Sequence, residues 1–204
     1  MNRETHIGGI VLAAGSSRRY GEDKRLSKLA SGRTMLEESI HQAASVLDRL
    51  VVILRFGDVQ LAEALDNKLS SAYAGKQIHC YCAPDSARGM AHSLANAIHL
   101  VGEWEAAAIF LGDMPYLQIE TIQKLVDSCH NNMAKEPIVV PVKSGRQGHP
   151  VIFHHHYFNE IEALEGDQGA KPVIDAHRQA VIEVSLDDEG IFMDIDRPQE
   201  AVCS

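Results

Sequence analysis

Residues 10–24 read Ile10-Val11-Leu12-Ala13-Ala14-Gly15-Ser16-Ser17-Arg18-Arg19-Tyr20-Gly21-Glu22-Asp23-Lys24. The apolar run over 7–14 is continuous rather than alternating, which predicts a parallel strand buried on both faces. Gly15 and Gly21 follow it, and glycine allows the backbone to turn tightly and to approach a ligand closely. Because loops after such strands form the ligand site of open α/β sheets, we expect this loop to line a binding site.

The same loop has the composition of an anion site. Successive backbone N–H groups in such a turn form a concave anion-binding surface, and Arg18, Arg19 and Lys24 add positive charge. The loop lacks the Gly-Lys-Ser/Thr ending of a Walker A motif and the Gly-x-Gly-x-x-Gly spacing of a dinucleotide fingerprint. We interpret it as a triphosphate-binding loop. The alternative is a strand end followed by a basic turn that binds no ligand.

The composition bounds the class of protein. The chain has 204 residues, of which 45% are hydrophobic and 23% charged, and this suits one globular domain over 1–204. The formal net charge of −9 argues against nucleic acid as a partner. No apolar run is long enough to span a bilayer, and the polar residues 1–6 lack the apolar region of a signal peptide. We therefore expect a cytoplasmic protein that binds neither nucleic acid nor membranes.

Strand and helix patterns alternate along the chain. Thr34 and Glu37 have the spacing of a capping box, which predicts a helix over about 35–47. Further helices are expected at 59–69, from near Gly89 onward, and at 118–129, 157–164 and 169–178; further strands are expected at 50–54, 77–82, 106–111, 137–142, 150–153, 180–184 and 190–195. This alternation predicts an α/β fold with a mostly parallel sheet and helices on both faces.

A family resemblance appears at the first loop. Leu12-Ala13-Ala14-Gly15-x-Ser17-x-Arg19-x-Gly21-x-x-Lys24 resembles the signature loop of the nucleotidyltransferases that attach a nucleotide to the molybdenum cofactor. The resemblance implies a single-domain Rossmann-like nucleotidyltransferase fold. It also implies that the nucleotide is bound by Leu12, Ala13, Ala14, Gly15, Ser17, Arg19, Gly21 and Lys24. Within this set, the resemblance implies catalytic roles for Lys24 and Arg19.

Two aspartates follow predicted strands and are candidate metal ligands. Asp113 comes after the apolar run 106–111, and Asp196 follows the run 190–195. Mg²⁺ takes one or two carboxylates together with substrate phosphates, so aspartates opposite a phosphate loop suit it. The alternative is that both are ordinary turn residues.

The resemblance extends to these aspartates. Leu111-Gly112-Asp113-Met114-Pro115 is similar to the Gly-Asp-Met-Pro motif of the family, and Asp194-Ile195-Asp196-x-Pro198 is similar to its closing segment. Arg197 stands where threonine is usual in that segment. The resemblance implies that Asp113 is catalytic and holds Mg²⁺ together with Asp196, with Asp194 as the alternative second ligand.

Two further segments resemble substrate-binding parts of the family. Gly89-Met90-x-x-Ser93-Leu94 is similar to the segment that contacts base and ribose, which implies nucleotide-binding roles for Gly89 and Ser93; the alternative is an ordinary helix start. Gly148-His149-Pro150-Val151 resembles the acceptor-side loop, which implies that Gly148, His149 and Pro150 contact the acceptor.

The resemblance implies a function. Ala13-Ala14-Gly15, rather than Ala-Gly-Gly, is similar to the cytidine-using branch, because Ala14 would crowd a guanine. We expect a Mg²⁺-dependent cytidylyltransferase that moves CMP from CTP to a molybdopterin-type acceptor and releases pyrophosphate, with a client molybdoenzyme as a further partner. The alternatives are another acceptor such as a sugar or alcohol phosphate, GTP as the donor, or a non-catalytic module that binds and delivers the cofactor.

Overall fold

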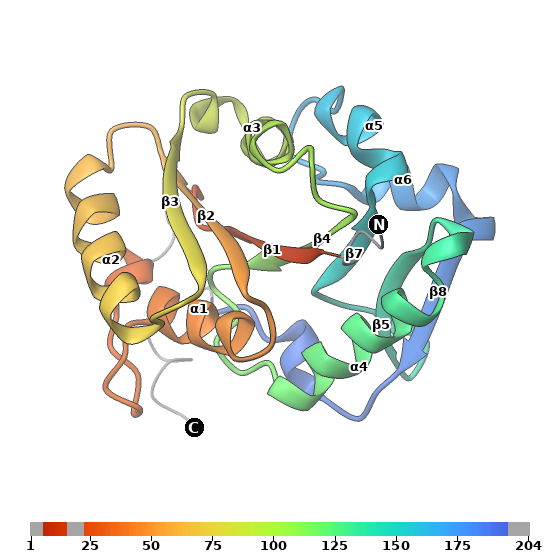
Figure 1. The fold of residues 1–204 in the computed structure, drawn as a ribbon, viewed down its shortest axis with the longest axis horizontal. Helices are drawn as coiled ribbons and strands as arrows, with labels where there is room; N and C mark the ends of the chain where they lie inside the picture. The colour runs from red at the N-terminus through yellow and green to blue at the C-terminus, as the bar shows by residue number, and fades with distance from the viewer. Residues whose placement is uncertain (1–5, 16–22, 196–204) are drawn as a thin grey trace.

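An open sheet organises the molecule (Figure 1). The computed structural model describes residues 6–15 and 23–195. Within these residues, eight strands form one sheet in the order β3-β2-β1-β4-β7-β5-β6, with β8 paired to β5. β3, β2, β1 and β4 are mutually parallel, β7 is antiparallel to both β4 and β5, and β8 is parallel to β5. The strands are β1 (Ile7–Leu12), β2 (Arg49–Arg55), β3 (Gln77–Ala83), β4 (Ala106–Leu111), β5 (Ile138–Lys143), β6 (Arg146–Gln147), β7 (Val151–His154) and β8 (Val181–Ser185).

Helices cover both faces of this sheet. They are α1 (Met35–Val46), α2 (Val59–Ala72), α3 (Met90–Leu100), α4 (Ile119–Asn131), α5 (Phe158–Glu162) and α6 (Lys171–Ala176). α1, α2 and α4 share one apolar cluster with Val11, whereas α3, α5 and α6 share a second cluster with Ile10. Adjacent residues of a strand point to opposite faces, so the two clusters lie on opposite sides of the sheet (Figure 1).

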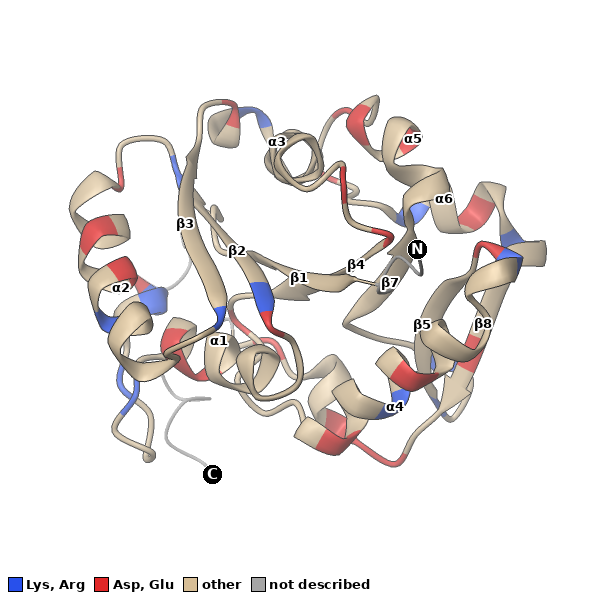
Figure 2. Ribbon diagram, viewed as in Figure 1, with Lys and Arg blue, Asp and Glu red and all other residues tan. Residues whose placement is uncertain are grey.

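The continuous apolar runs expected over 7–14 and 106–111 form the central strands β1 and β4. β1 pairs with β2 on one side and with β4 on the other, so that Ile10 lies between Val51 and Ile109. Neither β1 nor β4 carries a charged residue, and both are drawn in tan throughout in Figure 2. The predicted α/β fold, with a mostly parallel sheet and helices on both faces, is confirmed.

The first helix begins where its capping signal predicts. Thr34 Oγ1 accepts a hydrogen bond from Glu37 N at 3.3 Å, and the Glu37 carboxylate accepts one from Thr34 N at 3.0 Å. Both groups of the capping box therefore satisfy backbone N–H groups that the first helical turn leaves without a partner.

The expected strand over 190–195 is wrong. Residues Glu189–Phe192 form a 3₁₀ helix instead. Asp188 begins it, because its Oδ1 accepts a hydrogen bond from Gly190 N at 2.7 Å. Gly190 also lies against the carbonyl of Tyr116, where an added Cβ would be only 2.3 Å from that oxygen. Ile191 and Ile195 are buried in this tight turn rather than in a ladder, whereas Met193 is exposed.

Other differences concern element length. The helices expected over 157–164 and 169–178 are shorter, because α5 ends at Glu162 and α6 spans Lys171–Ala176. Residues expected as a turn near 145–149 contain the two-residue strand β6. Cys80, Cys82 and Cys129 are free thiols. None of the helices in the described part of the chain has the length and apolar character needed to cross a bilayer.

Candidate functional site

A cleft opens at the carboxyl ends of the parallel strands. After β1 the chain builds β2 and β3 on one side and then returns to place β4 on the other side. The strand order therefore reverses between β1 and β4, and such a switch point is where open α/β sheets bind ligands. The cleft has a volume of about 790 Å³. It is lined by Leu12, Ala13, Ala14, Gly15, Lys24, Arg25, Arg55, Phe56, Ser86, Ala87, Arg88, Gly89, Met90, Ser93, Leu111, Gly112, Asp113 and Asp167.

Most of the residues expected to bind the nucleotide line this cleft. The structure brings together Leu12, Ala13, Ala14, Gly15, Lys24, Gly89, Ser93 and Asp113 from four separate segments. Ser17, Arg19, Gly21 and Asp196 lie outside the described residues, so their expected roles remain predictions.

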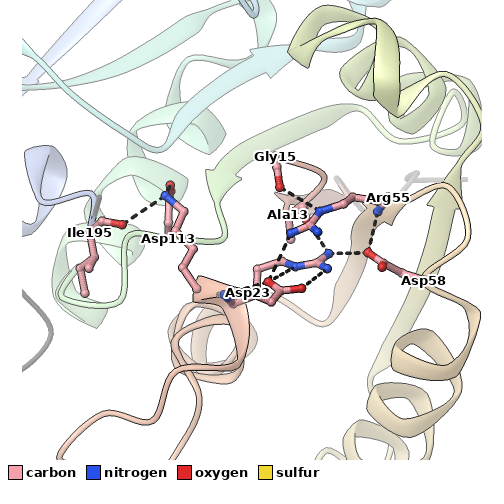
Figure 3. A network of polar contacts seen from close by, with 9 residues as sticks. Ala13, Gly15, Asp23, Arg55, Asp58, Asp113 and Ile195 are labelled. Atoms are coloured by element: carbon pink, nitrogen blue, oxygen red, sulfur yellow. Dashed lines mark hydrogen bonds and ion pairs between the residues drawn. The ribbon is translucent and has the colours of Figure 1, made fainter. Parts of the chain in front are cut away.

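Lys24 and Asp113 meet in the cleft although 89 residues separate them. Lys24 Nζ donates to Asp113 Oδ2 at 2.7 Å and to the carbonyl oxygen of Ile195 at 3.1 Å (Figure 3). The two side chains of the ion pair are 13% and 27% exposed. A second contact fixes this corner, because Ile195 N donates to Asp113 O at 3.0 Å.

Close packing of two strand ends brings Asp113 to the loop after β1. Gly112 N donates to Leu12 O at 2.9 Å, so the ladder between β1 and β4 continues one residue beyond β4. A Cβ added to Gly112 would come within 2.9 Å of the Ala13 Cβ. Glycine at this position therefore allows the approach that places Asp113 next to Lys24.

The oxygen atoms at this corner fit a hard divalent cation. A carboxylate oxygen of Asp113 and the Ile195 carbonyl face the same ammonium group, and such oxygens are the ligands that Mg²⁺ prefers. Among residues 6–15 and 23–195, no three His, Cys, Asp or Glu residues cluster as a complete metal site.

A buried arginine network holds the start of the loop, and sequence reasoning missed it. Arg25 is 3% exposed; its guanidinium donates to the carboxylate of Asp23 at 2.6 Å and of Asp58 at 2.6 Å. The same guanidinium donates to Ala13 O at 2.9 Å. Arg55 donates to Gly15 O at 2.9 Å and to Asp23 at 3.2 Å (Figure 3). These contacts fix two carbonyl groups of the loop after β1.

The network lowers the pKa of Asp23. The hydrogen bond from Arg25 lowers the pKa of Asp23 below its ordinary value, and this effect outweighs the opposing effect of burial. Asp23 therefore stays ionised to a lower pH than an ordinary aspartate does. The signal available in the sequence was only a row of cations and Asp23, since the partner Asp58 is 33 residues from Arg25.

The amino end of α3 forms another wall of the cleft. Gly89 has φ 122°, and a Cβ there would come within 2.4 Å of Asp167 Oδ1. The carboxylate of Asp167 accepts a hydrogen bond from Met90 N at 3.3 Å, so it occupies the first turn of the helix. Ser93 is buried, and its hydroxyl donates to Gly89 O at 3.4 Å.

The expected acceptor-binding residues lie beside the cleft. His149 and Pro150 line a separate cavity of about 10 Å³, together with Met114. Gly148 packs on Ile191, where a Cβ would come within 2.5 Å of the Ile191 oxygen. His149 Nδ1 is buried without a hydrogen-bond partner among the residues that the structure describes. Burial lowers the pKa of His149, and the negative charge of Asp113 opposes that shift.

The sequence matches a known family. The family is described as "MobA-like NTP transferase domain", and the match covers residues 9–181. The purine catabolism protein PucB of Bacillus subtilis (strain 168) is 28% identical over 204 residues, which cover 97% of this chain and 95% of that protein. A probable molybdenum cofactor guanylyltransferase of Natranaerobius thermophilus is 29% identical over 162 residues, with 78% and 73% coverage.

A solved structure is also similar along the whole chain. Rv0371c from Mycobacterium tuberculosis H37Rv has a TM-score of 0.77 and 28% sequence identity, with 97% of this chain and 96% of that chain covered. A complex of that protein with manganese has a TM-score of 0.72 and 26% identity, with 96% of each chain covered.

Proposed function

This chain belongs to the MobA-like NTP transferase family, and from that premise we propose that it transfers CMP from CTP to a phosphorylated acceptor of the molybdopterin type. The observation that carries the proposal is the 2.7 Å ion pair between Lys24 and Asp113 in the cleft. A positive charge beside a carboxylate suits a site where a triphosphate and its metal ion meet. The cleft volume of about 790 Å³ accommodates a nucleotide.

The chemistry follows from charge neutralisation. A phosphate oxygen of the acceptor forms a bond to the α-phosphorus of CTP, and the bond from that phosphorus to the pyrophosphate oxygen breaks. No general base is required, because a phosphate monoester has a second pKa of about 6 and is largely ionised at neutral pH. Lys24 and Arg19 stabilise the negative charge that grows on pyrophosphate.

Asp113 and Asp196 are the residues proposed to hold Mg²⁺. The bound ion supplies positive charge next to the reacting phosphate. The manganese complex of Rv0371c supports a divalent ion in this fold. With its carboxylate on such an ion, Asp113 would compensate less of the Lys24 charge, and Lys24 would direct more of that charge to the phosphates.

We propose CTP as the nucleotide and a molybdopterin-type acceptor because of the family resemblance. Ala14 lines the cleft, and the choice of CTP depends on the expectation that its methyl group crowds a guanine. The alternative nucleotide donor is GTP, because one relative is named as a probable molybdenum cofactor guanylyltransferase. That name also supports the molybdopterin-type acceptor, which we propose to lie near Gly148, His149 and Pro150.

Pyrophosphate release separates these possibilities. We expect the highest kcat/KM for CTP with the molybdopterin-type acceptor, measured against GTP and against a sugar phosphate. A higher value with GTP overturns the choice of nucleotide, and a higher value with the sugar phosphate overturns the choice of acceptor. Binding of both ligands without any release of pyrophosphate would support the delivery module.

Two variants test the mechanism. Lys24→Ala and Asp113→Ala should each abolish pyrophosphate release while the far-UV circular dichroism spectrum stays unchanged. Lys68→Ala is the matched control, because Lys68 pairs with Glu37 at 2.6 Å on the surface of α2, outside the cleft. Near wild-type turnover in either cleft variant would refute the proposed roles.

A further inference from the structure

Phe56 is an exposed aromatic residue on the wall of the cleft. Its 73% exposure is the largest among the large hydrophobic residues that the structure describes. Of the other exposed members of that group, only Met90 lines the cleft as well. An isolated apolar side chain on a surface needs no explanation, but one that lines a ligand cleft offers a flat apolar face to a ligand.

The backbone of Phe56 is held in place. Phe56 directly follows β2, and its N–H donates to Ser86 Oγ at 2.8 Å. Gly57 has φ 92°, which completes the turn into α2, and Asp58 N donates to Arg55 O at 3.1 Å. The ring therefore projects from a fixed point of the cleft wall, and the small residue Ala87, which follows Ser86, lines the cleft as well.

The strand order sets the distance between Phe56 and the charged corner of the cleft. Lys24 pairs with Asp113 beyond the end of β4, whereas Phe56 lies at the end of β2. One strand, β1, separates β2 from β4, and neighbouring strands lie about 4.8 Å apart, so Ile53 and Leu111, which both pair with Leu12, are about 10 Å apart. A ribose joins a base to its phosphates over a comparable span. A charged pair that suits phosphate and an apolar ring that suits a base thus line one cleft, from the ends of strands that are two positions apart in the sheet.

We propose that Phe56 forms one wall of the base subsite and that its ring stacks on the nucleobase. This inference depends on the proposed nucleotidyl transfer for the identity of the ligand. Stacking on an aromatic side chain tolerates any base, because every base has a π face. Phe56 therefore contributes affinity for CTP and GTP alike, and the choice between them comes from other groups of the cleft.

Direct nucleotide binding tests the proposal without turnover. Dissociation constants for CTP and for inorganic tripolyphosphate, each with Mg²⁺, are measured by isothermal titration calorimetry on the full chain. We expect Phe56→Ala to weaken CTP binding by roughly 10-fold, a loss typical of removing one stacking side chain. Tripolyphosphate has no base, so its affinity should stay unchanged. Phe56→Trp should retain or increase the affinity for CTP.

The binding experiment has a matched control variant. Leu100→Ala removes another exposed apolar side chain, on α3 and outside the cleft, and should leave both affinities unchanged. Unchanged CTP binding in Phe56→Ala, or an equal loss for CTP and tripolyphosphate, overturns the stacking role. A higher KM for the acceptor with unchanged CTP affinity also overturns it and assigns Phe56 to the acceptor. If the wild type binds CTP without releasing pyrophosphate, the proposed function fails while the test of Phe56 remains valid.

Discussion

Replacing Arg25 by methionine tests whether its network stabilises the fold. The substitution keeps an unbranched side chain but removes the guanidinium that donates to Asp23, Asp58 and Ala13 O. Removing one partner of a buried ion pair costs about 3–5 kcal/mol, because it leaves a charge without compensation. The carboxylates here are 27% and 23% exposed, so water reaches them and the lower end of that range, about 3 kcal/mol, is expected.

The magnitude is measured as the free energy of unfolding in urea, followed by circular dichroism. For a chain of this size a loss of about 3 kcal/mol corresponds to a decrease in Tm of about 6–12 °C. Arg178→Met is a matched control. Arg178 pairs with Asp175 at the same 2.6 Å, but its side chain is 77% exposed, and such surface pairs contribute at most about 1 kcal/mol. Equal losses in the two variants would refute the argument that burial gives the Arg25 network its effect.

The sign of the pH dependence is a second readout of the same experiment. The pKa of Asp23 is lowered in the folded state, so its ionisation adds stability above the ordinary value of 3.8. That stability is lost as the pH falls through the folded-state pKa. Without Arg25 the pKa returns toward its ordinary value or above it, so the difference between wild type and Arg25→Met should shrink below about pH 4. A difference that grows at acidic pH would contradict the assignment.

Three further predictions concern single elements. Thr34→Ala removes the capping box of α1 and should lower the free energy of unfolding by about 1 kcal/mol in urea denaturation, whereas an unchanged value would mean that water replaces the cap. Gly89→Ala places a Cβ 2.4 Å from the carboxylate of Asp167 at φ 122°, so we expect a loss of about 1–3 kcal/mol and weaker CTP binding; wild-type Tm and affinity would contradict this strain. Burial raises the pKa of Cys129 to about 12, so the thiol should resist iodoacetamide at pH 8 until the protein unfolds, and rapid labelling of the native protein, detected by mass spectrometry, would show that the site is open.

The central strands of the fold were predictable from their continuous apolar sequence. A strand covered by helices on both faces must be apolar at every position, and both β1 and β4 have this character. The segment 190–195 has apolar residues too, yet it forms a turn, because Asp188 caps it and Gly190 packs against a carbonyl. Local apolar content does not separate these two outcomes. The contact with Tyr116 that decides between them is distant in the sequence.

The sequence predicted only those residues of the candidate site that follow the central strands. Lys24 and Asp113 both follow central strands, and the switch in strand order brings them to 2.7 Å from each other. Their catalytic roles remain predictions. In contrast, nothing in the sequence distinguishes Arg25 from the cations before it, because the inward direction of its side chain is set by the position of Asp58.

The balance of charge in the cleft connects the fold to the proposed chemistry. Arg25 and Arg55 line the cleft, but their guanidinium groups donate to Asp23 and to carbonyl oxygens of the loop after β1. These arginines therefore hold carbonyl groups of the loop in place, and Asp23 compensates part of their positive charge. The charge of Lys24 is compensated by Asp113 in the same way. Under the proposed roles of Lys24 and Asp113, we expect a triphosphate and a divalent ion to favour each other's binding, because an ion that attracts the Asp113 carboxylate leaves more of the Lys24 charge for the phosphates.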